Sequence, residues 1–309
     1  MRHSVVVPLF DKRAYIGETI ASLAAQEQPP DEILVVDDAS TDGSAQEAER
    51  ALARHAEELR VTRTEVVRRA RNAGPGAARN VGIERATGDL ISFLDADDCY
   101  RSDGLRAIGE RMRAHALDLA VLGYESDPPG ERFPDHALLA GELVELADDV
   151  FLLPEPLRTA AHPEFFMGRA SNVVVRRRWL GPHRYCVASR LNEGIDFWYR
   201  VLKDIAAHAG ARVGLIAAPL VRFRILGDSL SHRLCRDWRA LELPPTILRY
   251  ADSTDAHDRR LVDMLGRRWL EHALQVLPDV GQKRAFVAHH RAFLARLGVG
   301  TPLHGTTPP

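Results

Sequence analysis

Short apolar runs and helix-like segments alternate along the chain from residue 4 to residue 124. Runs rich in Val, Ile and Leu, each long enough for one buried strand, are separated by segments in which apolar residues recur every three or four positions. The expected strands are 4–8, 32–37, 61–68, 90–94 and 119–124, and the expected helices are 15–28, 44–59, 76–86 and 102–115. Helical crossovers of this length join parallel strands, so the alternation predicts an α/β fold with a mostly parallel sheet flanked by helices on both faces.

Acidic side chains crowd the end of the fourth of these strands. The apolar run 90–94 is followed within four residues by Asp95, Asp97 and Asp98. Like charges this close repel one another unless a cation lies among them. A hard divalent ion, Mg²⁺ or Mn²⁺, would take one or two of these carboxylates and obtain its other oxygens from a phosphorylated ligand. The alternative is a solvated acidic turn before the next helix.

Other charged residues fall at equivalent places in the predicted sheet. Ligands of open α/β sheets bind beyond the carboxyl ends of the strands. The charged residues at or just past such ends are Asp11, Asp37, Asp38, Arg71, Asp95, Asp97 and Asp98. Their convergence on one edge favours a ligand site over an isolated acidic turn.

The turn after the first strand argues against two common classes of nucleotide-binding protein. Residues 9–13 contain no glycine, whereas a dinucleotide-binding turn needs glycines so that its backbone can approach a pyrophosphate. The Gly-Lys-Ser/Thr signature of a P-loop kinase is also absent from the sequence. Instead, Phe10 suits stacking on a base, and Asp11 and Asp38 suit hydrogen bonds to a base or ribose.

Composition and cysteine spacing argue against further classes of protein, such as nucleic-acid-binding, disulfide-rich and membrane-spanning proteins. The net charge of the 309 residues is −2, which gives no reason to expect a nucleic-acid partner. The 3 cysteines lie far apart and form neither a zinc pattern nor a disulfide framework, so a reducing compartment is expected. No signal peptide is recognised and no apolar run approaches the ~18 residues of a membrane span. These features predict a cytoplasmic protein.

Four segments resemble, in order and spacing, the motifs of family-2 glycosyltransferases of GT-A fold. They are Val5–Phe10, Ile33–Ser44, Arg71–Gly82 and Asp95–Asp98. The resemblance implies a GT-A-like, Rossmann-type sheet and an inverting transferase. It also implies a nucleotide-diphosphate sugar as donor, most often a UDP-sugar, and Mn²⁺ or Mg²⁺ as cofactor.

The resemblance further implies roles for individual residues. Those expected to bind the nucleotide sugar are Pro8, Phe10, Asp38, Arg71, Arg79 and Asp95, together with Asp11 from the turn after the first strand. Asp97 is the expected principal metal ligand, with Asp98 beside it.

The second half departs from the family at its catalytic acid. Inverting transfer needs a carboxylate that takes a proton from the acceptor. The matching stretch of this chain is Asn192–Arg200, and the family's Asp position is occupied by Gly194. Glu193 and Asp196 share a helix face and are the candidate replacements, with Glu193 preferred for its longer side chain. The alternative is that Glu193 only caps the helix and that Asp196 is a buried partner of a nearby arginine.

A second departure follows downstream. Residues 221–232 resemble an Arg-x-His-x-x-Ser element in which the His and Ser approach the diphosphate or the metal. Arg224 and Ser229 are retained, but Leu226 occupies the His position, and His232 is the candidate replacement ligand. These departures leave open a degenerate relative that binds nucleotide or sugar without catalysis. A nucleotidyltransferase is disfavoured because no glycine-rich basic loop follows the first strand.

The pattern divides the chain into a catalytic domain, 1–235, and a helical extension with a tail, 236–309. The catalytic domain comprises a nucleotide-binding half, 1–124, and an acceptor half, 125–235, with a returning strand at 168–175. Helices are expected at 259–277 and 282–297, either capping the catalytic domain or pairing in a homodimer, and a frayed tail at 298–309. The acceptor is not identified: a glycan, a lipid-linked sugar, a peptide or a small molecule would all fit.

Overall fold

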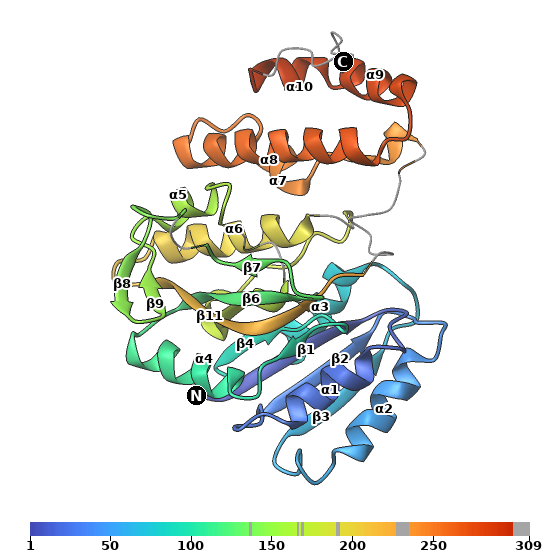
Figure 1. Ribbon diagram of the computed structural model, residues 1–309, viewed down its shortest axis with the longest axis vertical. Coiled ribbons are helices and arrows are strands. Elements are labelled where there is room, and N and C mark those ends of the chain that lie inside the picture. The colour runs from blue at the N-terminus through green and yellow to red at the C-terminus, as the bar shows by residue number, and fades with distance from the viewer. Residues whose placement is uncertain are drawn as a thin grey trace. The chain divides into compact units, whose positions relative to one another are not determined.

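The structure is a computed structural model, and it describes residues 1–135, 138–165, 167, 170–189, 192–226, 235 and 237–298. Contacts within the chain divide it into two compact units, Met1–Ile225 and Leu226–Pro309, both drawn in Figure 1. We call them the sheet unit and the helical unit. The sequence pattern placed this division later, after residue 235. Each unit has its own buried core.

The first half of the sheet unit alternates strands and helices as predicted (Figure 1, blue to green). Its elements are β1 (His3–Leu9), α1 (Ile16–Ala24), β2 (Glu32–Asp37), α2 (Ser44–Arg54), β3 (Arg63–Arg68), α3 (Pro75–Arg85), β4 (Leu90–Phe93) and α4 (Gly104–Ala114). The strands pair in parallel in the order β3-β2-β1-β4, with Leu9 opposite Asp37 near the carboxyl ends. Every residue of β1 and β2 is buried, as expected for parallel strands covered on both faces.

The second half adds strands of both directions. Its elements are β5 (Cys99–Tyr100), β6 (Leu119–Asp127), β7 (Arg132–Phe133), β8 (Val144–Ala147), β9 (Val150–Leu152), α5 (Pro156–Ala160), the 3₁₀ turn η1 (Ala170–Asn172), β10 (Val173–Arg176), the 3₁₀ turn η2 (Arg177–Trp179), α6 (Glu193–Ala206) and β11 (Val213–Arg224). Within the described residues all strands join one sheet, in the order β3-β2-β1-β4-β10-β6-β11-β9-β8, with β5 on β11 and β7 on β6. The returning strand predicted at 168–175 is β10, which lies antiparallel between β4 and β6.

Strand β11 is the longest of the strands that the sequence pattern missed; the others are β5, β7, β8 and β9. Strand β11 runs parallel to β6, but its register shifts between Ile216 and Val221, around Pro219. These irregularities break the two-residue alternation by which a half-buried strand is recognised. Gly123 of β6 lies against them: a Cβ at this position would come within 2.5 Å of the carbonyl oxygens of Ala217 and Ala218. Only glycine fits there without a shift of the backbone.

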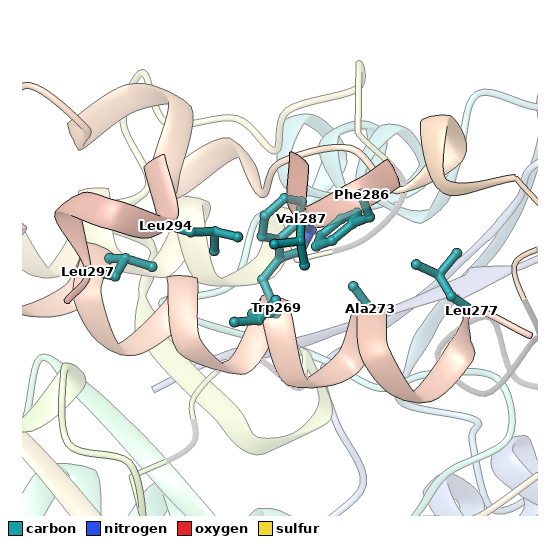
Figure 2. Close-up of a cluster of buried hydrophobic side chains, with 8 residues drawn as sticks. Trp269, Ala273, Leu277, Phe286, Val287, Leu294 and Leu297 are labelled. Atoms are coloured by element: carbon teal, nitrogen blue, oxygen red, sulfur yellow. The ribbon is translucent and has the colours of Figure 1, made fainter. Parts of the chain in front are cut away.

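The helical unit consists of η3 (Trp238–Ala240), α7 (Pro245–Tyr250), α8 (Ala256–Val276), α9 (Val280–His289) and α10 (Arg291–Arg296). Asp255 and Asp279 cap α8 and α9 by accepting hydrogen bonds from backbone N–H groups of the first turn. Figure 2 shows the core of this unit, which contains Trp269, Leu270, Ala273, Leu277, Phe286, Val287, Leu294 and Leu297. The helix predicted at 282–297 is interrupted at His290, whose ring packs edge-on against Trp269 at 4.7 Å between centroids.

Among the helices that the structure describes, none is both long enough and apolar enough to cross a membrane. Most of the tail predicted at 298–309 lies outside the described residues.

Candidate active site

The acidic turn after β4 has a rigid backbone. The N–H of Asp98 donates to the carbonyl oxygen of Asp95 at 2.9 Å, which closes the turn. From α1, the hydroxyl of Thr19 donates to the carbonyl oxygen of Ala96, also at 2.9 Å. The backbone N–H of Asp95 donates to Ser171 Oγ at 3.0 Å. Because the backbone is held from several sides, the three carboxylates of the turn have distinct, fixed surroundings.

Asp98 is a structural residue of this turn. It is 1% exposed, and its two carboxylate oxygens accept hydrogen bonds from Ser171 Oγ (2.6 Å) and from the backbone N–H of Arg224 (3.0 Å). Burial, followed by the charges of Asp95 and Asp97, raises the pKa of Asp98 well above its ordinary value. In the structure its oxygens tie the turn to η1 and to the end of β11, and the expectation that Asp98 lies beside Asp97 as a metal ligand stays a prediction.

Asp97 has a partner of a different kind. Its Oδ2 lies 2.6 Å from the ammonium of Lys12, which belongs to the turn after β1. Burial, and then the charge of Asp95, raises the pKa of Asp97 above its ordinary value, and Lys12 opposes this rise. The carboxylate is thus paired with a side-chain cation, and its side chain is 18% exposed.

The residues present fit a divalent ion held by few protein ligands. Over the residues that the structure describes, no three His, Cys, Asp or Glu side chains gather closely enough to hold a metal by themselves. Mg²⁺ in phosphate-binding sites commonly takes only one or two carboxylates and completes its shell with phosphate oxygens and water. Asp97, with Asp95 beside it, matches that arrangement. His232 lies outside the described residues.

One buried arginine joins the end of β4 to the start of α6. Arg79, on α3, donates from Nη2 to Asp95 Oδ1 and from Nη1 to Glu193 Oε1, both at 2.8 Å. Burial by itself would lower the pKa of Arg79, but the nearby negative charges hold it above its ordinary value. Gly76, also on α3, leaves the necessary space, because a Cβ there would lie 2.9 Å from Cβ of Tyr185 and 3.3 Å from Cγ of Glu193.

Tyr185 packs beside Gly76 and Arg79 of α3, and it is not among the residues expected from the sequence. Its backbone is held by Asn80, which accepts from the N–H of Tyr185 at 2.7 Å and donates to its carbonyl oxygen at 3.0 Å. The ring stacks on Phe197 at 3.9 Å between centroids and lies 5.3 Å from the guanidinium carbon of Arg79. Its hydroxyl is buried and has no hydrogen-bond partner among the described residues. Burial raises its pKa above the ordinary value.

The two candidate catalytic acids of α6 have different surroundings. Glu193, the first residue of the helix, reaches Arg79. Asp196 is fully buried and accepts a hydrogen bond from Nε of Arg200, one turn further along, at 3.0 Å. For Asp196 this is the alternative that the sequence left open, a buried partner of a nearby arginine. The catalytic expectation therefore rests on Glu193.

Asp38, at the end of β2, shapes a loop rather than offering free oxygens to a nucleoside. It is 2% exposed, accepts hydrogen bonds from the N–H groups of Ala73 (3.0 Å) and Gly74 (2.7 Å), and forms an ion pair with Arg69. The expectation that this side chain binds the nucleoside is thus not supported by its contacts. Arg71, in the same loop, is exposed and forms no ion pair with the residues described.

The turn after β1 carries the remaining nucleoside-binding candidates. Pro8 is buried within β1, opposite Val36 of β2. Phe10 is 43% exposed, which leaves its ring accessible for stacking. Asp11 has a positive φ of 48° and accepts a hydrogen bond from the N–H of Thr41 at 2.8 Å. These contacts bring the turns after β1 and β2 together at one edge of the sheet.

Arg224, at the end of β11, reaches the same edge. Its guanidinium forms an ion pair with Glu18 at 2.5 Å and lies 5.1 Å from the ring centroid of Tyr15. Lys12 lies 5.6 Å from the centroid of the same ring. Two cations therefore gather around Tyr15, next to the acidic turn. Ser229, the other retained residue of this element, lies outside the described residues.

Lys12, Ser171 and Tyr185 are candidate site residues that the sequence pattern did not reveal. Lys12 had one usable signal, its position in the turn after β1, where Phe10 and Asp11 were already candidates. Ser171 and Tyr185 had none, because their contacts with the acidic turn and with α3 join segments that are distant in the sequence.

Comparison with known proteins relates this chain to glycosyltransferases. The family model described as "Glycosyl transferase family 2" matches residues 4–172. TuaG of Bacillus subtilis (strain 168), named for teichuronic acid biosynthesis, is 36% identical over 121 residues, covering 39% of this chain and 46% of TuaG. The poly(ribitol-phosphate) beta-N-acetylglucosaminyltransferase TarS of Staphylococcus aureus is 29% identical over 189 residues, covering 54% of this chain and 32% of TarS. The chain thus spans less than half the length of either relative.

Solved structures agree on the fold. TarS 1–349 of S. aureus in complex with UDP-GlcNAc superposes with a TM-score of 0.64 at 17% identity, covering 96% of this chain and 82% of that one. The mannosyltransferase PcManGT of Pyrobaculum calidifontis, in complex with GDP-Man and Mn²⁺, gives a TM-score of 0.55 at 18% identity. The superposition covers 95% of this chain and 80% of that one. The predicted GT-A-like α/β fold is confirmed by these likenesses. Since the family model also takes in more than half of the 309 residues, the chain belongs to glycosyl transferase family 2.

Proposed function

We propose that the chain transfers a sugar from a nucleotide-diphosphate sugar, with UDP as the favoured nucleotide, to an acceptor with inversion and with help from Mn²⁺ or Mg²⁺. Family membership supports transfer of a sugar. The structural neighbours were solved with UDP-GlcNAc and with GDP-Man and Mn²⁺, which supports a nucleotide-sugar donor and a divalent ion. The proposal rests mainly on one observation: Arg79 binds an acid at the end of β4 and an acid at the start of α6 with the same guanidinium.

The donor would lie along the carboxyl ends of β1, β2 and β4. Phe10 would stack on the base, and Arg71 would supply positive charge from the loop that Asp38 fixes. Cleavage of the bond between the anomeric carbon and the diphosphate leaves negative charge on the departing oxygen. Lys12 and Arg224 are the cations close to that position. A divalent ion held by Asp97 would supply Lewis-acid stabilisation of the diphosphate.

The acceptor would be activated by Glu193. Arg79 holds Oε1 of this residue, whereas Oε2 accepts no hydrogen bond from the described residues. A carboxylate oriented by one oxygen can take the acceptor's proton with the other as the acceptor attacks the anomeric carbon. Asp95, on the same arginine, would contact the ribose or the sugar. Because attack and departure occur on opposite faces of the sugar, the configuration would invert.

A non-catalytic nucleotide-sugar-binding protein is the second candidate. The observation that favours it is the near-complete burial of Glu193, which is bound by Arg79 instead of facing an open site. The acceptor class, the cytoplasmic location and a homodimer through the helical unit stay predictions.

Calorimetry with UDP tests the proposed donor site. We expect UDP to bind more tightly with Mn²⁺ than in EDTA, and NAD not to bind under either condition. Asp97→Ala should abolish the metal dependence and leave the circular dichroism spectrum unchanged. Equal UDP affinities with and without EDTA in the unsubstituted protein would contradict the metal proposal. Binding of NAD but not UDP would contradict the nucleotide-sugar proposal.

A further inference from the structure

Lys12 is the cation that the structure places on the candidate metal ligand. Its ammonium lies 2.6 Å from Oδ2 of Asp97, and the two side chains are 26% and 18% exposed. Burial, and then the negative charge of Asp95, makes ionisation of Asp97 costly, so a positive partner within contact distance favours the charged carboxylate. In the structure, Lys12 is that partner.

The backbone of Lys12 is fixed, but its side chain is held only at the tip. The N–H of Lys12 donates to Ser44 Oγ at 2.8 Å, and its carbonyl oxygen accepts from the N–H groups of Tyr15 and Ile16 at the start of α1, both at 3.0 Å. Among the described residues, the ammonium forms an ion pair with Asp97 and lies 5.6 Å from the centroid of the Tyr15 ring. A lysine side chain has a flexible stem of four carbons, so its ammonium group can move several ångströms while the backbone stays in place.

A divalent ion and the ammonium cannot share Asp97 Oδ2 without strong repulsion, because both would lie within contact distance of the same oxygen. Binding of Mn²⁺ at this oxygen of Asp97 therefore requires Lys12 to leave. The released ammonium would still lie close to Tyr15, whose ring centroid is 5.6 Å from it, and the guanidinium carbon of Arg224 lies 5.1 Å from the same centroid as a second positive charge. A diphosphate bound to the ion would present its oxygens to these cations.

We propose that Lys12 is an exchangeable cation of the donor site: it neutralises Asp97 when no divalent ion is bound, is displaced by that ion, and then binds the diphosphate of the nucleotide. The last step rests on the proposed function, whereas the exchange at Asp97 does not. Lys12 would thus set how much divalent ion is needed before a nucleotide diphosphate binds, and it would support weak binding without metal.

The first experiment uses Mn²⁺ alone and measures free Mn²⁺ by electron paramagnetic resonance. Lys12→Met removes the charge and keeps the length of the side chain. We expect it to bind Mn²⁺ between about two and five times more tightly, the size of effect that a partly exposed ion pair can produce. Lys12→Arg keeps the competing charge and should resemble the unsubstituted protein. Lys283→Met, on α9, makes the same change in net charge and should not alter Mn²⁺ affinity.

Unchanged Mn²⁺ affinity in Lys12→Met would overturn the exchange, as would a lack of Mn²⁺ binding in every variant. Equal tightening in Lys283→Met would also overturn it, because net charge alone would then explain the effect. Thermal melting of each variant checks that it is folded, and Lys12→Gln serves if Lys12→Met is not.

The second experiment measures UDP binding in EDTA by calorimetry. Lys12→Met should weaken this binding by about tenfold, since a charged hydrogen bond to the diphosphate is lost. Equal affinities in the two proteins would overturn the binding of Lys12 to the diphosphate. If no variant binds UDP with or without Mn²⁺, the proposed function fails, while the Mn²⁺ measurements still decide whether Lys12 competes for Asp97.

Discussion

The acids of the turn after β4 and the acids of α6 occupy opposite kinds of environment. The side chains of Asp95 and Asp97 are 31% and 18% exposed, whereas those of Glu193 and Asp196 are 8% and 0% exposed. The first pair follows a strand end, where parallel sheets bind their ligands. The second pair lies on a helix whose next residues, Phe197 to Tyr199, belong to the core.

This contrast in exposure indicates which acids can exchange their cationic partners for a ligand. Asp95 and Asp97 of the turn are partly exposed and are balanced by cations from other segments, so they can exchange partners with a ligand. Glu193 and Asp196 of α6 are buried and paired with arginines. Loss of either arginine would leave a buried negative charge without its partner, which is energetically costly. Arg79 belongs to both sets, because it binds Asp95 and Glu193 together. If the proposed function is correct, the partly exposed acids of the turn belong to the donor site, and the proposed base on α6 acts while it is bound to Arg79.

The largest effect is expected from Glu193→Gln, which tests whether the enclosed acid is a base. Transfer of sugar to an acceptor should fall by roughly two to four orders of magnitude, the usual contribution of a positioned general base. UDP affinity should stay close to that of the unsubstituted protein, because the proposed nucleotide site lies at the strand ends and not on α6. Release of UDP in the presence of an acceptor panel measures the rate, and Glu271→Gln on α8 provides the matched control. An unchanged rate would show that the base lies elsewhere.

Asp196→Asn should separate the two acids of α6. Arg200 would lose its buried negative partner, so we expect the free energy of unfolding to fall by about 2 kcal/mol, as for hydrogen bonds to charged groups. The transfer rate per folded molecule should change by less than about tenfold, because Asp196 has a structural contact rather than one to Arg79. Urea unfolding measures the first effect, with Asp263→Asn on α8 as control. A large loss of rate with unchanged stability would reverse the assignments of Glu193 and Asp196.

The smallest effect is expected from Tyr185→Phe. The hydroxyl of Tyr185 is buried without a partner among the described residues, and such a group costs roughly 1 kcal/mol or more. Removing it should raise the free energy of unfolding by about 1 kcal/mol, while the stack on Phe197 and the contact with Arg79 stay in place. Thermal and urea unfolding measure the change. A loss of stability would mean that the hydroxyl of Tyr185 does form a hydrogen bond, in addition to the contacts described for this side chain.

Local sequence pattern predicted the first half of the sheet well, for a physical reason. Strands β1, β2 and β4 are buried apolar runs, and the helical crossovers between them leave little choice but parallel pairing. The same pattern located the acidic turn, because a strand end followed by three carboxylates is visible without knowledge of the fold. It failed for β11, where bulges disrupt alternation, and for the antiparallel insertion of β10 between β4 and β6.

The roles of the acids were decided by tertiary structure. Asp97 and Asp98 are neighbours in the sequence, yet one pairs with Lys12 at the surface of the site and the other is buried against Ser171 and the backbone of Arg224. Each of these contacts joins segments separated by many tens of residues, so no spacing rule could reveal it. The sequence by itself determined that carboxylates gather at a strand end and that a family-2 pattern surrounds them. Which carboxylate stays available to a ligand depended on burial and on the partner that the folded chain brings to it, because these set the cost of its charge.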